Sequence, residues 1–156
     1  MDASFRIRPT TLADLPALVA VEQACFSDPW SARSLQQAIQ SETSRSFVAE
    51  NAGGVVGYVL ARISGPEGEI LDLAVVPSVR RRGVGRSLLN VAKDALHGAG
   101  VVEVYLEVRE SNQAAIALYQ AEGYRPTGMR RHYYRNPLED ALVLRAALEP
   151  RGNSDP

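Results

Sequence analysis

The sequence contains a single cysteine, Cys25, which excludes a disulfide within the chain. One thiol fits a reducing compartment, and we expect a cytoplasmic protein. No apolar run approaches the roughly 20 residues of a membrane span, and residues 1–9 are charged rather than signal-like, so we expect neither membrane insertion nor secretion. Positive charge is not in excess. The formal net charge of -1 gives no global field that could hold a nucleic acid, and no direct nucleic-acid partner is predicted.

The chain has 156 residues, of which 46% are hydrophobic and 22% are charged, as is typical of one domain with a sizeable core. We expect a single domain over residues 1–149, in a monomeric protein. The tail, residues 150–156, has no apolar anchor and is predicted to be disordered. No metal site is predicted, because His97 and His132 lie far apart and no cysteine or histidine spacing suggests zinc.

The first half of the chain changes from a helical period to a strand period. Apolar residues recur at helical spacing from Leu12 to Cys25, and Pro16 is compatible with this helix only if its first turn begins late. Ser31 is expected to cap a second helix. A period of two from Ser46 onward then predicts an antiparallel hairpin. The expected elements are a strand over residues 5–8, helices over residues 12–25 and 32–40, and hairpin strands over residues 47–50 and 55–62.

The second half predicts a parallel crossover. Residues 69–76 form an almost wholly apolar strand, as expected for a strand covered on both faces, and a helix follows from Gly83. Because residues 101–108 form the next strand, the three elements make a right-handed strand–helix–strand unit. A capped helix and a final pair of strands, residues 124–134 and 141–148, complete the chain. The predicted fold class is therefore mixed α/β, with a mostly antiparallel sheet that contains one parallel pair and has helices on both faces.

The segment from Arg80 to Arg86 is a candidate site for a phosphate-containing ligand. It opens a helix directly after a buried strand, so free backbone N–H groups and the positive helix end converge there. Its glycines let the backbone approach a pyrophosphate, and its arginines can meet further phosphate charge. It lacks the Gly-Lys-Ser/Thr of a P-loop, and Leu88 stands where the dinucleotide fingerprint has its third glycine. Considered alone, the segment is also compatible with a solvated basic loop.

Motifs along residues 5–148 resemble the GNAT family of acetyl-CoA-dependent N-acetyltransferases. The family pattern is matched by Leu-Ala-Val-Val-Pro before the R-x-x-G-x-G loop, by Leu-Glu-Val-Arg followed by Ser-Asn, and by Ala-Leu-Tyr. Pro-Trp-Ser at residues 29–31 and Arg-Arg-His-Tyr-Tyr at residues 130–134 are similar to the RimI branch, which acetylates the N-terminal alanine of a small-subunit ribosomal protein. The resemblance implies acetyl-CoA as the donor and a protein N-terminus as the acceptor.

The resemblance also implies where acetyl-CoA binds. In this family, the strand matching residues 69–76 bulges and splays from the strand matching residues 101–108, and the cofactor lies in the opening. A sheet edge opened inside a domain must find another partner for its backbone groups. The residues implied are Leu73, Ala74 and Val75 for the pantetheine arm, Arg81, Arg82, Gly83, Val84, Gly85 and Arg86 for the pyrophosphate, and Asn112 farther along the cofactor.

Acetyl transfer needs a group that takes a proton from the amine and another that gives one to the departing thiolate. Glu107 matches the family's base position, although a glutamate at a strand end is otherwise a surface residue. Tyr119 matches the residue that protonates the sulfur of coenzyme A, and a phenol of pKa ~10 is protonated at neutral pH. Without the motif, Tyr119 would be a core tyrosine. By analogy with the family, the backbone N–H of Val75 meets the oxyanion.

Further assignments concern the acceptor. Tyr133 and Tyr134 match an aromatic pair near the acceptor's N-terminus, and Trp30 is either a structural anchor between the first helices or part of the acceptor site. Cys25 is expected in the core. Because the glycine loop indicates which donor binds and gives no information about the accepting amine, two alternatives stay open: a GNAT enzyme for a small-molecule amine, and a non-catalytic acetyl-CoA-binding module.

Overall fold

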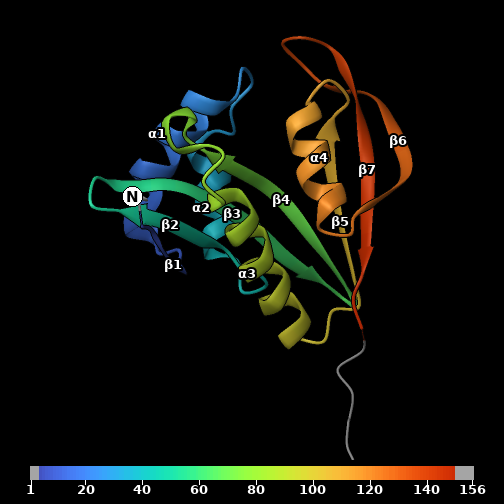
Figure 1. Cartoon of the computed structure of the whole chain (residues 1–156), viewed down its shortest axis with the longest axis horizontal. Coiled ribbons are helices and arrows are strands. Elements are labelled where there is room, and N and C mark those ends of the chain that lie inside the picture. Colours follow the sequence, from blue (N-terminus) through green and yellow to red (C-terminus); the bar gives the residue numbers. More distant parts are fainter. Residues whose placement is uncertain (1–3, 150–156) are drawn as a thin grey trace, which may run out of the picture.

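A seven-stranded sheet in the order β1-β2-β3-β4-β5-β7-β6 runs through the protein, whose computed structural model describes residues 4–149 (Figure 1). All neighbouring strands are antiparallel except β4 and β5, which confirms the expected fold class. Among these residues, no helix is both long and apolar enough to cross a membrane. The strands are β1 (Arg6–Pro9), β2 (Phe47–Asn51), β3 (Gly54–Ser64), β4 (Glu67–Val75), β5 (Glu103–Arg109), β6 (Arg125–Tyr134) and β7 (Glu139–Ala147), and the helices are α1 (Leu15–Cys25), α2 (Ala32–Gln40), α3 (Val84–Gly98) and α4 (Gln113–Ala121).

The element boundaries differ from the expected ones by a few residues. Residues Leu12–Asp14 form a 3₁₀ turn, and α1 begins only at Leu15. Pro16 then lies in the first turn of α1, where its missing N–H leaves no helical hydrogen bond unmade. β4 begins at Glu67 rather than at residue 69, because Glu67 already pairs with Ser64 across the hairpin. The tail predicted to be disordered lies outside the described residues.

Helices cover both faces of the sheet, and strand alternation divides the core between them. On one face, Leu18 of α1 and Leu35 of α2 are fully buried against side chains such as Tyr58. On the other face, α3 packs against β3, where Leu88 of α3 and the neighbouring residue Val59 are fully buried, and Ile116 of α4 belongs to the same buried cluster. The sheet is therefore a middle layer, and its interior strands have little exposed side-chain surface.

β4 and β5 pair at one end only. Their register runs from Glu67 opposite Glu103 to Ile70 opposite Leu106, and no pairing continues beyond it in the described chain. β4 also bulges at this point, because Leu71 has no partner in the register with β3. Figure 1 shows the two strands diverging, so the sheet opens into a V. The expected splayed parallel pair is present.

Candidate active site

The opening of the V exposes backbone groups of β4. The Val76 N–H donates to the Val56 carbonyl of β3 at 2.9 Å. Because antiparallel pairs alternate between hydrogen-bonded and non-hydrogen-bonded, Leu73 and Val75 turn their N–H and C=O groups away from β3 and into the opening. Ala74 lies between them and turns its backbone groups toward β3. Two of the three residues predicted for the pantetheine arm therefore present unpaired amides there.

The open edge of β4 already attracts polar side chains. The Arg80 Nε donates to the Val75 carbonyl at 3.0 Å, and the Cys25 thiol donates to the same oxygen at 3.4 Å. Cys25 is half-buried, and burial raises the pKa of its thiol. Cys25 is thus a neutral packing residue beside the opening.

The start of α3 offers a second set of free amides. Gly83 precedes the helix with φ of 84°, in the left-handed region that favours glycine, and no side chain of the described residues caps this end. The first helical hydrogen bond runs from the Ser87 N–H to the Gly83 carbonyl at 3.0 Å, so the amides of residues 83–86 have no helical acceptor. A Cβ at Gly83 would meet nothing within 4 Å, which shows that the space before the helix is open.

The arginines of this segment differ in their contacts. Arg81 and Arg82 are exposed, and Arg81 has a φ of 67°. Arg86 is exposed too, but its Nε pairs with Glu122 at 2.9 Å. Free amides, a positive helix end and two solvent-facing guanidiniums fit a diphosphate. The predicted pyrophosphate segment therefore has groups that can bind a diphosphate.

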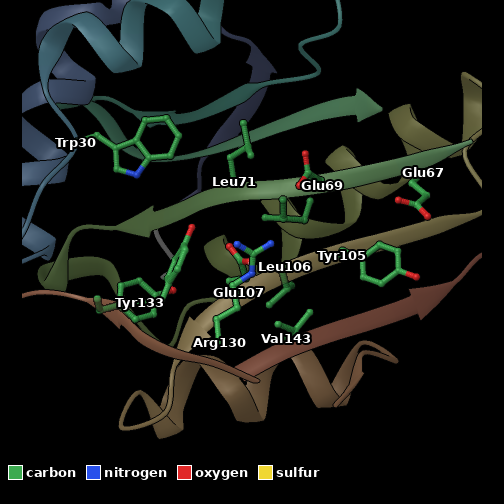
Figure 2. A pocket seen from close by; sticks show the side chains of 12 residues that line it. Trp30, Glu67, Glu69, Leu71, Tyr105, Leu106, Glu107, Arg130, Tyr133 and Val143 are labelled. Carbon is green, nitrogen blue, oxygen red and sulfur yellow. The ribbon is translucent and has the colours of Figure 1, made fainter. Parts of the chain in front are cut away.

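A cavity of about 330 Å³ lies along β4 and β5 on the side away from α3 (Figure 2). Trp30 lies at one end, Glu67 and Tyr105 lie at the other, and Glu107 and Arg130 lie between them. A smaller cavity of about 150 Å³ adjoins it and reaches α4. The residues that line both cavities are Trp30, Ile70, Leu71, Glu107 and Tyr134.

Glu107 extends from β5 between the two cavities. Its side chain is 25% exposed and lies on the same side of the strand as Tyr105, as strand alternation predicts. The Arg130 Nε pairs with the Glu107 Oε2 at 2.5 Å, and the Arg130 guanidinium lies 5.5 Å from the centre of the Tyr133 ring. Burial and the neighbouring Glu107 carboxylate raise the pKa of Tyr133. One carboxylate oxygen of Glu107 is thus held by Arg130, and the Tyr133 phenol lies beside the same carboxylate.

Tyr119 reaches the smaller cavity from α4. It is only 7% exposed, and its ring packs edge-on against Tyr124 with 5.9 Å between the ring centres. Burial raises the pKa of Tyr119 above its usual 10. The phenol is therefore protonated throughout the physiological range, as a proton donor must be. Glu107 and Asn112 line the same cavity.

Two loops flank the cavities from opposite arms of the V. Arg109, the last residue of β5, lies 4.6 Å from the centre of the Tyr134 ring at the end of β6 and donates at 2.9 Å to the Pro137 carbonyl in the loop between β6 and β7. In the α1–α2 connector, the Ser27 hydroxyl donates to the Asn136 carbonyl at 2.6 Å. The aromatic side chains Trp30, Tyr133 and Tyr134 therefore lie on segments that are tied to each other.

The predicted site residues gather in two places. Trp30, Leu73, Glu107, Asn112, Tyr119 and Tyr134 line the smaller cavity, and Tyr133 lines the larger one. The Asn112 Oδ1 accepts from the Ala115 N–H at 3.2 Å and so caps α4. The segment of residues 81–86 lines neither of these cavities and lies at the start of α3, next to the open end of β4.

Sequence reasoning missed a buried acidic cluster. Glu22 and Tyr58 are almost fully buried, and both carboxyl groups, of Glu22 and Asp72, contact the Tyr58 hydroxyl. Burial and the neighbouring Glu22 raise the pKa of Asp72 well above its usual value. The available signal was a charged residue inside an apolar pattern, since Glu22 interrupts the stripe of α1 and Asp72 interrupts the apolar run of β4.

The chain is similar in sequence and in structure to known acetyltransferases. Residues 15–124 match the acetyltransferase (GNAT) family. The chain is 35% identical over 133 residues to the ribosomal protein bS18-alanine N-acetyltransferase of Escherichia coli (strain K12), covering 84% of this chain and 89% of that protein. It is 36% identical over 152 residues to the N-alpha-acetyltransferase RimI of Mycobacterium tuberculosis, covering 94% and 91%. The crystal structure of the E. coli ribosomal-protein-S18-alanine N-acetyltransferase superimposes with a TM-score of 0.88 at 32% identity, covering 98% of this chain and 99% of that chain.

Proposed function

The chain belongs to the GNAT family of acetyltransferases and is an acetyl-CoA-dependent N-acetyltransferase, and from that premise we propose that its acceptor is the N-terminal α-amine of a protein. The proposed acceptor is the N-terminal alanine of a small-subunit ribosomal protein, because the E. coli relative is named for acetylating an alanine of ribosomal protein bS18. One observation carries the proposal: Glu107 lines both the cavity beside the β4–β5 opening and the larger cavity between the two flanking loops. A base at that junction can serve an amine that enters from the larger cavity.

The donor site follows the free backbone groups. Acetyl-CoA supplies an acetyl group activated as a thioester. We assign its pantetheine arm to the edge of β4 at Leu73–Val75, where two amides lack a strand partner. We assign its diphosphate to the amides of residues 83–86, with the guanidiniums of Arg81 and Arg82 beside them. Asn112, which lines the smaller cavity, is assigned to the same cofactor.

The proton transfers are assigned to Glu107 and Tyr119. As the new N–C bond forms, Glu107 takes a proton from the α-amine, whose pKa of about 7.7–8.0 leaves part of it neutral near pH 7. As the C–S bond breaks, Tyr119 gives its phenolic proton to the thiolate sulfur. The Val75 N–H, which points into the opening, is assigned to the developing oxyanion. The acceptor nitrogen loses one proton and the sulfur gains one, so the reaction balances.

The acceptor's position follows from the flanking aromatics. Trp30, Tyr133 and Tyr134 line the larger cavity, with Trp30 and Tyr133 at the same end of it, and an extended N-terminal segment can lie between them. Arg130 neutralises one oxygen of Glu107 and covers Tyr133, so the wall there is a paired charge rather than a bare carboxylate. We infer that the site accepts a free α-amine carried by a small first residue.

The test is an acceptor comparison with the purified full chain and acetyl-CoA, in which release of the coenzyme A thiol is followed. The three acceptors are a peptide that begins with alanine, the same peptide with its N-terminus blocked, and a polyamine. Turnover of the free peptide alone supports the proposal. Turnover of the polyamine alone indicates a small-molecule acetyltransferase, and thermal stabilisation by acetyl-CoA without any turnover indicates a binding module. Either of the last two results overturns the proposed acceptor.

A further inference from the structure

The buried cluster of Glu22, Tyr58 and Asp72 joins three separate parts of the fold. Glu22 belongs to α1, Tyr58 to β3, and Asp72 to β4 directly after the bulge. Glu22 is 1% exposed and Tyr58 is fully buried. The Glu22 Oε1 accepts a hydrogen bond from the Tyr58 hydroxyl, and that hydroxyl lies 3.3 Å from the Asp72 Oδ2.

The cluster also reaches the acceptor side of the site. The Glu22 Oε2 accepts from the backbone N–H of Trp30 at 2.8 Å. Trp30 lines both cavities, and Leu73, the residue after Asp72, is the first of β4 to turn its amide into the opening. A continuous chain of hydrogen bonds therefore runs from the acceptor-side connector, through the core, to the donor-side strand.

Two carboxyl groups beside one buried hydroxyl cannot both carry a charge without a large penalty. Glu22 accepts hydrogen bonds from both the Trp30 N–H and the Tyr58 hydroxyl, whereas the Asp72 Oδ2 lies 3.3 Å from that hydroxyl, so the negative charge resides on Glu22 and the shared proton on Asp72. Burial and the neighbouring Glu22 also raise the pKa of Asp72. Glu22 is then the acceptor of the Trp30 N–H and the Tyr58 hydroxyl, and the neutral Asp72 carboxyl donates toward the oxygen of the same hydroxyl, 3.3 Å from its Oδ2. This arrangement satisfies a carboxylate that is almost wholly removed from water.

We propose that Glu22 and Asp72 are positioning residues for acetyl transfer, which hold the connector at Trp30 against the open edge of β4. This inference rests on the proposed function, since the acceptor must enter beside Trp30. Glu22 acts as a hydrogen-bond acceptor and Asp72 as a neutral donor. The two acids are therefore not equivalent, although they lie in one cluster.

The difference between the two acids makes the proposal testable with amide substitutions. In Asp72→Asn the amide N–H still donates as the protonated carboxyl does, so we expect the KM for the alanine peptide and kcat to stay within about threefold of the wild type. In Glu22→Gln one acceptor oxygen becomes a donor that faces the Trp30 N–H or the Tyr58 hydroxyl. Losing a buried hydrogen bond to a charged group raises the KM for the peptide about tenfold or more, while the KM for acetyl-CoA is unchanged.

A spectroscopic readout is independent of the acceptor. Trp30 is the single tryptophan of the sequence, so fluorescence excited selectively at tryptophan, where the 6 tyrosines do not absorb, reports on this connector alone. We expect Glu22→Gln to shift the emission to the red and to increase quenching by acrylamide, and Asp72→Asn to change neither. Because no acceptor is added, this result stands even if the protein acetylates another amine, which separates failure of the inference from failure of the proposed function.

Two further variants keep the test decisive. Asp72→Leu removes the donor and is expected to behave like Glu22→Gln. Tyr58→Phe keeps the buried ring, removes only the hydroxyl, and replaces Glu22→Gln in the comparison if that variant does not fold, as judged by circular dichroism. The inference is overturned if Glu22→Gln and Asp72→Asn give the same fluorescence, or if Asp72→Asn is the more damaging of the two.

Discussion

Replacing Tyr119 with phenylalanine isolates the proposed proton donor. The hydroxyl of Tyr119 has no hydrogen-bond partner among the described residues, and the ring keeps its edge contact with Tyr124, so the free energy of unfolding should change by less than about 0.5 kcal/mol. The effect on catalysis is expected to be much larger. A positioned general acid contributes about 10²–10⁴-fold to the rate, and here the lower end applies.

The lower end follows from the burial of Tyr119. Burial raises the pKa of its phenol above 10, whereas a thiol has a pKa of about 8.5, so complete proton transfer is uphill by at least about 2 kcal/mol. We therefore expect kcat to fall about 10²-fold, equivalent to about 2.7 kcal/mol, with the KM for acetyl-CoA unchanged. Because a raised pKa keeps the phenol protonated as the pH rises to 10, the ratio of wild-type to variant kcat should be constant between pH 6 and 9.

The assay is thiol release at saturating acetyl-CoA, with Tyr124→Phe as the matched control. Tyr124 is fully buried and its hydroxyl has no partner in the described chain. Removing that hydroxyl should leave kcat unchanged and stabilise the fold by about 1 kcal/mol, because an unsatisfied buried group is lost. A Tyr119→Phe enzyme that works at the full rate would refute the acid assignment.

Three other predictions concern the base, the glycine turn and the first helix. Glu107→Gln should lower kcat/KM for the alanine peptide about 10²-fold or more, with the greatest loss below pH 7.7, where the amine is mostly protonated; equal loss at every pH from 6 to 9 would contradict a role in deprotonation. Gly83→Ala should lower the free energy of unfolding by about 1 kcal/mol, because its positive φ strains an alanine, and should raise the KM for acetyl-CoA. The control is Gly65→Ala, which has a φ of 65° in a distant turn: it should lower the free energy of unfolding by as much in a denaturant titration without changing that KM. The hydrogen bonds from Arg8 lower the pKa of Asp14, so their stabilisation is present above about pH 4 and is lost as the pH falls. In thermal unfolding, Asp14→Asn should therefore lower the stability by about 1–2 kcal/mol at pH 7 and by less at pH 3. The same loss of stability at both pH values would refute this.

Local features of the fold were predictable because their causes lie within a few residues. The Ser31 hydroxyl accepts the Ser34 N–H at 3.1 Å and starts α2 as expected, and Pro16 delays α1 as its missing N–H requires. The strand–helix–strand unit followed from periodicity alone. By contrast, the divergence of β4 from β5 depends on pairing between distant segments, and only the family resemblance implied it.

The contacts within the site could not be read from the sequence for the same reason. Glu107 was predicted as the base, but its ion pair with Arg130 depends on the register in which β6 pairs with β7. Glu22 looked like part of an apolar stripe, since its partners Tyr58 and Asp72 lie 36 and 50 residues farther along the chain. A single buried acid is costly, so the cluster becomes understandable only when the three-dimensional structure brings its donors together.

Amide hydrogen exchange, resolved by residue with NMR in the absence and presence of coenzyme A, tests whether β4 and β5 are open where acetyl-CoA is proposed to bind. We expect coenzyme A to slow exchange at Leu73, at Val75 and at residues 83–86, and to leave Ala74 unchanged because its N–H already faces β3. Protection of Leu73 and Val75 in the free protein would mean that β4 and β5 are paired there, and would contradict the opening on which the proposed chemistry depends.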